Sequence, residues 1–235
     1  MPADLTQADL DALKAYDTPT ICNALEVVAP ERRAHGFNRR PLVAPFPALK
    51  PVVGYARTAT IRSREADRRS KEEARALRIR YYEHIAERPL PSIAVLQDVD
   101  GPDIGFGAFW GEVQTNLHKA LGCLGVITDG SVRDLDAMAE GFFVLAGSVM
   151  PSHAHVSLVE IGGAVSVAGM IVAANDIIHA DRHGAVVIPP AAVRKIPEAA
   201  DRIARREKVL LDAAKRPGFS VEELRRALAE ADEIH

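Results

Sequence analysis

SIAVLQDV, at residues 92–99, is an almost unbroken apolar run, and a second one, LGVIT, stands at 124–128. Between them lie a glycine-rich segment from Gly101 to Gly111 and a helical pattern over 112–121. Strand, helix and strand in this order predict a parallel βαβ unit. The pattern continues with a predicted turn and helix after residue 130 and a further strand, FFVLAGS, at 142–148. The stretch therefore predicts an α/β core.

The segments before this core predict two helices, a loop and a strand. TQAD at residues 6–9 resembles a capping box, which predicts a short helix. Thr18 precedes Pro19, which predicts that the Thr18 hydroxyl caps a second helix. Residues 29–50 are rich in proline and arginine and predict a surface loop, and VVGYARTATI at 52–61 predicts a strand.

Residues 62–88 are a highly charged insertion before the core. Charges of both signs follow each other closely, which favours a solvent-facing helix with many ion pairs. The alternative is a lid or partner-binding element in which Tyr81 and Tyr82 face another surface.

The segments after the core predict a β meander and closing helices. Four β-like runs lie between residues 155 and 188, with no helical pattern between them. Residues 190–213 predict one helix, and SVEE at 220–223 predicts a capping box for another that ends near 232. Because no repeat or linker interrupts the chain, residues 1–235 are expected to form a single domain.

Composition excludes several classes of protein. The 235 residues are 48% hydrophobic, which is enough for a core, and 29 basic against 32 acidic residues give a net charge of -3. No general positive field is present to collect phosphates, so nucleic acid is not expected as a ligand. The first residues lack the features of a signal peptide, and no apolar run approaches the roughly 18 residues of a membrane span. With two cysteines in no C-x-x-C pattern, we expect a cytoplasmic protein that does not bind membranes.

GVITDGSVRD, at residues 125–134, carries the first candidate site. Arg133 and Asp134 are predicted in the first turn of a helix, where the positive end of the helix dipole keeps a carboxylate ionised. Asp134 is then a candidate ligand for a hard divalent cation, and Arg133 a candidate for binding a substrate carboxylate. The structural alternative is that Asp134 caps the helix while Arg133 makes a surface ion pair.

GEVQ, at residues 111–114, carries the second candidate site. It follows the glycine-rich segment and opens a helix, where free backbone N–H groups bind anions. Glu112 is a candidate for relaying a proton, and the simpler alternative is that it only interacts with the helix dipole.

Two short segments of the chain resemble the paired signature of the regulator of ribonuclease activity A-like family. The first is Gly111, Glu112, Val113 and Gln114, and the second ends in Arg133 and Asp134, with Arg133 standing 21 residues after Glu112. That family includes the 4-hydroxy-4-methyl-2-oxoglutarate (4-carboxy-4-hydroxy-2-oxoadipate) aldolases, which are class II pyruvate aldolases. TPTICNAL at 18–25 and DIIHADRHGAVVIP at 176–189 are also similar to the family, although Asn23 stands in place of an aspartate and Asn175 in place of a glycine.

The resemblance implies a layered α/β/β/α sandwich of the swivelling-domain type with C-terminal helices. It also implies that Asp134 anchors Mg²⁺ or Mn²⁺, that Arg133 and the backbone of residues 111–114 bind a pyruvoyl acid, and that Glu112 positions a water. The expected reaction is cleavage of a carbon-carbon bond through a metal-stabilised pyruvate enolate, with oxaloacetate decarboxylation as a related activity. A homotrimer or homohexamer with sites between subunits is implied as well, with Glu207 as the candidate residue from a neighbour.

Three alternatives remain open. The chain could be a non-catalytic regulator that binds a ribonuclease, which is the other role in the family. His179, Asp181 and His183, spaced by two residues on one predicted strand, could bind zinc. The glycines at 105, 107 and 111 also suggest a nucleotide-binding loop, although their spacing does not match G-x-G-x-x-G.

Overall fold

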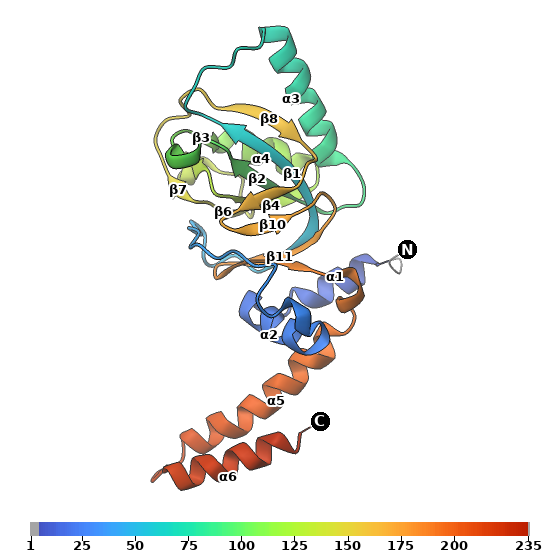
Figure 1. Ribbon diagram of the computed structural model, residues 1–235, viewed down its shortest axis with the longest axis vertical. Helices are drawn as coiled ribbons and strands as arrows, with labels where there is room; N and C mark the ends of the chain where they lie inside the picture. Colours follow the sequence, from blue (N-terminus) through green and yellow to red (C-terminus); the bar gives the residue numbers. More distant parts are fainter. Residues whose placement is uncertain (1–4, 235) are drawn as a thin grey trace.

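The computed structural model describes residues 5–234, and a mixed seven-stranded sheet forms its centre (Figure 1). The strand order is β12-β11-β1-β2-β4-β6, and β8 also pairs with β1. The strands β1, β2, β4 and β6 are mutually parallel, whereas β8, β11 and β12 are antiparallel to their neighbours. Their bounds are Val52–Arg62 (β1), Ser92–Asp98 (β2), Cys123–Thr128 (β4), Phe143–Leu145 (β6), Ser157–Ile161 (β8), Ile177–Asp181 (β11) and Gly184–Ile188 (β12). The α/β class predicted from the sequence is confirmed.

A second, three-stranded sheet lies at the carboxyl ends of the main strands. It contains β3 (Ala108–Trp110), β5 (Ser131–Val132) and β7 (Ser148–Val149), which are all parallel. Each short strand follows a main-sheet strand along the chain: β3 follows β2, β5 follows β4, and β7 follows β6. Three chain segments therefore leave the main sheet side by side, and this brings distant parts of the sequence together.

The two faces of the main sheet are covered differently. Along β2, Ala94 and Leu96 pack in the cluster that contains α3 (Lys71–Ala86). Ile93 and Val95 pack on the other face against the hairpin of β9 (Val165–Val167) and β10 (Met170–Val172). Because side chains alternate along a strand, an unbroken apolar run is what a strand buried on both faces requires. The result is a helical layer, the main sheet and a second β layer.

The remaining helices cover the β11–β12 end of the sheet and extend beyond it. α1 (Gln7–Leu13), α2 (Thr18–Val28) and the start of α5 (Ile196–Ala214) bury apolar side chains against β1, β11 and β12. α6 (Val221–Asp232) packs on α5, and the two form a hairpin that projects from the body (Figure 1). This α5–α6 hairpin exposes several large apolar side chains: Leu211, Phe219, Val221, Leu224 and Leu228.

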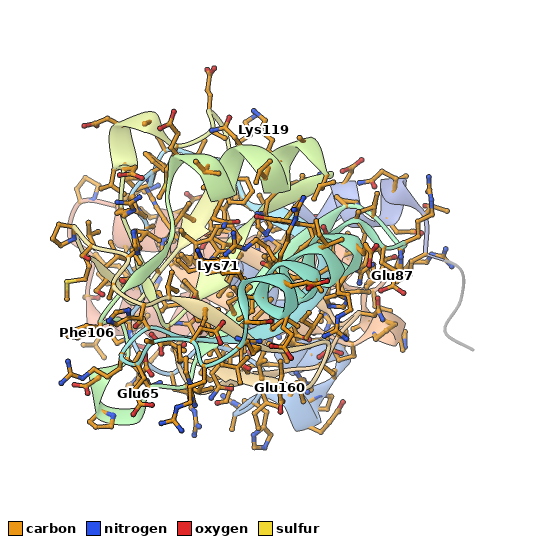
Figure 2. The ribbon with its side chains drawn as sticks, turned by 90° about the horizontal axis from the view of Figure 1, so that it is seen from above. Glu65, Lys71, Glu87, Phe106, Lys119 and Glu160 are labelled. Carbon is orange, nitrogen blue, oxygen red and sulfur yellow. The ribbon has the colours of Figure 1, made fainter. Side chains whose placement is uncertain are left out.

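The charged insertion is part of the fold and not merely a solvent-facing helix. Within α3, Leu77, Tyr81 and Ile85 are buried against the sheet. Figure 2 looks down on this helix, with Lys71 at its start and Glu87 just beyond its end. The charge pattern did not predict this buried face of α3, because its three buried residues stand among many charged ones.

Other boundaries were predicted less well. Asp17, not Thr18, is the N-cap of α2, and its carboxylate accepts the N–H of Thr20. The predicted helix at 190–213 begins as a separate 3-10 turn, Pro190–Ala192, before α5. The helix predicted directly after residue 130 is wrong, because the structure has β5 and a 3-10 turn at Leu135–Ala137 there. The capping box at Thr6 and Asp9 is confirmed. The predicted meander is wrong: the strands after residue 155 are antiparallel, but β8 pairs with β1, β9 and β10 form a hairpin of their own, and β11 and β12 form another in the main sheet.

Across residues 5–234, no helix has both the length and the apolar character that crossing a bilayer requires.

Candidate active site

The two sequence motifs meet where β3 and β5 end. The N–H of Arg133 donates to the carbonyl oxygen of Trp110 at 2.9 Å. This bond continues the parallel pairing of Trp110 with Val132, and the residues that follow on the two segments lie in contact. Gly111 and Asp134, which are 23 positions apart in the sequence, therefore become neighbours.

Gly111 is needed here for space. A Cβ at this position would lie 2.6 Å from Oδ2 of Asp134 and 3.3 Å from Cγ of Arg133. The backbone of Gly111 is extended, with φ of -168°, so any residue could adopt its conformation. The missing side chain allows the Asp134 carboxylate to lie directly against the start of α4 (Glu112–Ala120).

The N-terminus of α4 is suited to a negative charge. Its N-cap, Gly111, has no side chain to accept the first N–H groups of the helix. The N–H groups of residues 112–114 have no acceptor within the helix, because the first intrahelical bond is the one that the N–H of Thr115 donates to the carbonyl of Gly111. Free N–H groups and the positive end of the helix dipole together favour a bound anion.

Asp134 does not lie in the first turn of an α-helix, contrary to the sequence prediction. Its backbone is left-handed (φ 54°, ψ 41°), it precedes a 3-10 turn, and its side chain caps nothing. Aspartate adopts this conformation more readily than most residues. The dipole that acts on its carboxylate is therefore that of α4, a different element, and the helix-capping alternative is wrong.

Arg133 and Asp134 form an accessible pair of opposite charge. Nε of Arg133 lies 3.5 Å from Oδ2 of Asp134, and the two side chains are 37% and 36% exposed. An ion pair this exposed adds little to stability. Both groups remain open to a ligand, and Glu112 and Val113 on the adjoining turn are exposed as well.

Gln114 connects this turn to the inserted helix α3. Its side-chain oxygen accepts the hydroxyl of Tyr82 at 3.0 Å. Its carbonyl oxygen accepts Nδ1 of His118 at 2.7 Å, so Nε2 of His118 carries no proton and accepts the hydroxyl of Tyr81 at 2.8 Å. Burial lowers the pKa of His118 to about 4, which keeps the ring neutral. Sequence reasoning missed this chain of bonds, because His118 alone gives no signal of its partner.

The donor set fits a hydrated hard cation better than a closed metal site. Among residues 5–234, no group of three or more histidine, cysteine or acidic side chains could hold a metal ion. Mg²⁺ commonly takes one or two carboxylates and keeps several waters, and the exposed Asp134 carboxylate allows this.

The zinc site considered at 179–183 is wrong. His179 is fully buried, and its two ring nitrogens contact the hydroxyl of Thr18 and the carbonyl of Tyr16, both at 3.0 Å. Asp181 accepts the N–H of Thr18, and His183 lies beyond the end of β11 in the hairpin turn. His179 and Asp181 attach the start of α2 to β11, and Asp181 also contacts Nδ1 of His183 at 3.1 Å, but the three side chains form no group that could hold a metal ion.

Two buried carboxylates whose roles the sequence did not reveal lie at the carboxyl ends of β2 and β4. Oδ2 of Asp98, at the end of β2, accepts the N–H of Gly105 at 2.8 Å. Oδ1 of Asp129, at the end of β4, accepts the N–H of Asp98 at 2.9 Å. Burial raises the pKa of both groups. Because the oxygens of both carboxylates accept backbone N–H groups, they fix the backbone where the chain leaves β2 and β4 toward the site.

Comparisons with known proteins agree on one family. Residues 9–187 match the family described as RraA-like: Aldolase/RraA. An uncharacterized protein of Methanocaldococcus jannaschii is 38% identical over 103 residues, which are 43% of this chain and 50% of that protein, so the match spans half of the relative's length.

Solved structures show the same fold at low sequence identity. An uncharacterized protein from Pseudomonas syringae pv. tomato is 20% identical with a TM-score of 0.70, and 96% of each chain is covered. Streptomyces coelicolor RraAS2, described as an unusual member of the RNase ES inhibitor RraA protein family, is 19% identical with a TM-score of 0.68. That likeness covers 90% of this chain and 98% of RraAS2.

Proposed function

This chain belongs to the RraA-like family of aldolases and RraA proteins, and from that premise we propose that it is a divalent-metal-dependent lyase. Its substrate is a 2-oxo acid with a pyruvoyl end, and it cleaves the carbon-carbon bond that releases pyruvate. Aldol cleavage of the 4-hydroxy-4-methyl-2-oxoglutarate type is the leading reaction, and oxaloacetate decarboxylation is the related one.

The observation that carries this proposal is the contact of Asp134 with Gly111 beside Arg133. Three groups then lie together at an accessible surface: the Asp134 carboxylate for a cation, the Arg133 guanidinium for a substrate carboxylate, and the N-terminus of α4. A protein that acts only by surface contact has no chemical need for this combination.

Each group has a role that follows from its chemistry. The guanidinium of Arg133 binds the substrate carboxylate with two parallel hydrogen bonds. The N–H groups of residues 112–114 bind the same end of the substrate, and Glu112 holds or moves the proton of a nearby water. Mg²⁺ or Mn²⁺ held by Asp134 would supply Lewis-acid stabilisation of the charge that develops on the 2-oxo oxygen.

Assembly into a homotrimer or homohexamer is part of the proposal. The α5–α6 hairpin projects from the body (Figure 1). It exposes several large apolar side chains, and such surfaces are typical of subunit contacts. Glu207 is exposed on α5 and is the candidate for completing a neighbour's site. Cys22 and Cys123 are free thiols, which suits the reducing cytoplasm.

The proposal is tested by measuring pyruvate release from oxaloacetate and from 4-hydroxy-4-methyl-2-oxoglutarate with Mg²⁺, with Mn²⁺ and with a chelator. We expect metal-dependent release that Asp134→Asn abolishes. Asparagine keeps the shape of the side chain and tolerates the left-handed backbone. Asp136→Asn, on the adjoining 3-10 turn and also exposed, is the matched control. No release from either substrate by a folded protein would contradict the proposal.

The second candidate function is regulation of a ribonuclease by binding, which the outer face of α3 favours. This face exposes Arg75, Arg78 and Ile79 beside the acidic start of the helix. Charge reversal, Arg75→Glu with Arg78→Glu, should abolish ribonuclease inhibition if α3 is the contact surface. In that case Asp134→Asn should leave the inhibition unchanged.

A further inference from the structure

We propose that this protein has a second ligand site, separate from Asp134, that binds a small organic anion. The site is a cavity of about 590 Å³ between residues 32–39 and the strands β10 and β12, here named the Arg32/Arg39 cavity. Its volume is within the range of small-molecule sites. It shares no lining residue with the corner formed by Gly111, Arg133 and Asp134.

The cavity contains positive charge that the described residues do not neutralise by ion pairing. Arg32 donates to the carbonyl of Val187 at 3.3 Å, and Arg39 donates to the carbonyl of Gly169 at 3.2 Å. Neither guanidinium has a carboxylate partner within residues 5–234, and Nε of Arg32 is buried without a hydrogen-bond acceptor. A guanidinium has five N–H donors, so most of the donors of both groups remain for a ligand.

Other hollows of comparable charge differ in this respect. In the one beside the start of α3, Arg69 is paired with Asp67 at 2.8 Å. In the one near the end of β4, Arg40 lies 3.6 Å from Asp129. Arg68 in the first of these hollows also lies 3.8 Å from Glu65. Among the described residues, one arginine of these two hollows, Arg62, has no ion pair, whereas both arginines of the Arg32/Arg39 cavity lack one.

Both guanidinium groups are held by close contact with a glycine. A Cβ at Gly36 would lie 1.9 Å from a terminal nitrogen of Arg32, and one at Gly169 would lie 2.9 Å from Nε of Arg39. Both glycines have positive φ, 86° and 85°, which other residues rarely adopt. Each guanidinium thus lies close to a glycine of the lining and donates to a backbone carbonyl, which orients it before a ligand arrives.

The loop that carries these side chains is attached to the sheet. The N–H of Val187 donates to the carbonyl of Gly36 at 2.7 Å, and the N–H of Arg39 donates to the carbonyl of Ala168 at 2.9 Å. Phe37 also forms an isolated bridge with Val186. Fixing the loop lowers the entropy that ordering a ligand site would otherwise cost.

The rest of the lining selects an anion that has an apolar part. Phe37, Ile171, Ile188 and two prolines contribute apolar surface, and Ile171 is largely exposed. Asp176 is the single acidic side chain of the lining, and one of its oxygens accepts the N–H of Ala173 at 2.8 Å. The chemistry that fits is a carboxylate or phosphate joined to a hydrocarbon or aromatic group.

The test is isothermal titration calorimetry of the full chain with four probes, in the presence of a chelator. Benzoate and phenyl phosphate carry both required parts, inorganic phosphate lacks the apolar part, and benzyl alcohol lacks the charge. We use the Asp134→Asn variant as well, so that binding at the corner around Asp134 is recognised separately. We expect saturable binding of benzoate or phenyl phosphate that survives both the chelator and Asp134→Asn, and the tighter of the two identifies the anion.

Variants of the cavity decide the outcome. Arg39→Gln should weaken that binding by about tenfold or more, because a charge-assisted pair of hydrogen bonds is lost. Arg32→Gln should do the same, with its fold checked by circular dichroism. Arg33→Gln is the matched control, since Arg33 pairs with Glu26 at 3.2 Å outside the lining. Unchanged affinity in the Arg39 variant, equal binding of benzyl alcohol, or no binding of either organic anion would overturn the proposal.

Discussion

Gly111→Ala tests the geometry of the candidate active site most directly. The new methyl group would lie 2.6 Å from Oδ2 of Asp134, whereas ordinary contact begins near 3.4 Å. The carboxylate must therefore move by about 0.8 Å, or α4 must move by a similar amount. Because a misplacement of about 1 Å in an active site can lower a rate by about 100-fold, we expect metal-dependent pyruvate release to fall by roughly 10- to 100-fold.

The variant should affect the site and leave the fold intact. The extended backbone of Gly111 accepts alanine, and because Gly111 is the N-cap of α4, where alanine is less favourable than glycine, the change costs only about 0.5–1 kcal/mol. Mn²⁺ binding, measured by calorimetry, should weaken in parallel with activity while the melting temperature changes little. Gly163→Ala is the matched control, because its Cβ would meet nothing within 4 Å and its φ is not positive. Wild-type activity and Mn²⁺ affinity in Gly111→Ala would refute the placement of Asp134 against α4.

Three further predictions concern the surroundings of the site. Burial lowers the pKa of His118 from 6.5 to about 4. As the pH falls, the imidazole of the unfolded chain is therefore protonated before that of the folded protein. The stability that the neutral ring contributes is complete above pH 6.5 and is lost as the pH falls toward 4. His118→Gln should therefore reduce the acid-induced fall in the free energy of urea unfolding by about 3 kcal/mol, and an equal fall in both proteins would contradict this. Asn175→Gly keeps the positive φ of 71° but removes an acceptor from the buried guanidinium of Arg57, so thermal unfolding should show a loss of about 1–3 kcal/mol, and unchanged stability would contradict the role of this bond. Tyr82→Phe removes the hydroxyl that holds the side chain of Gln114, and steady-state kinetics should show KM for the 2-oxo acid raised about two- to fivefold with kcat changed less, whereas a lower kcat at constant KM would argue against a positioning role.

The centre of the main sheet was predictable because two of its strands come from apolar runs. The segments at 92–99 and 124–128 became β2 and β4, which pair in parallel with α4 between them along the chain. The small sheet was not predictable. β5 and β7 have two residues each and β3 has three, which is too short for an alternating pattern. They form because three segments leave the main sheet together, and that is a property of the tertiary fold.

The candidate residues were identified from the sequence, but the interactions that place them were not. Asp134 was expected to benefit from the dipole of its own helix, whereas the structure puts it against α4. Asn175 departs from the residue that the family resemblance leads one to expect. The structure accounts for it, because asparagine tolerates positive φ and also binds Arg57. Both effects depend on partners more than 20 positions away in the chain, where local patterns carry no information.

The projecting hairpin has a consequence for how the protein opens. α6 packs mainly on α5, and the apolar side chains that the pair leaves exposed stabilise nothing within residues 5–234. In a single chain, the amide hydrogens of α6 should therefore exchange with solvent through local opening, long before those of β1 or β2, which are buried in the sheet. If a second copy of the chain covers that face, exchange in α6 slows selectively. The protection factors of α6 would then depend on protein concentration, while those of the sheet would not.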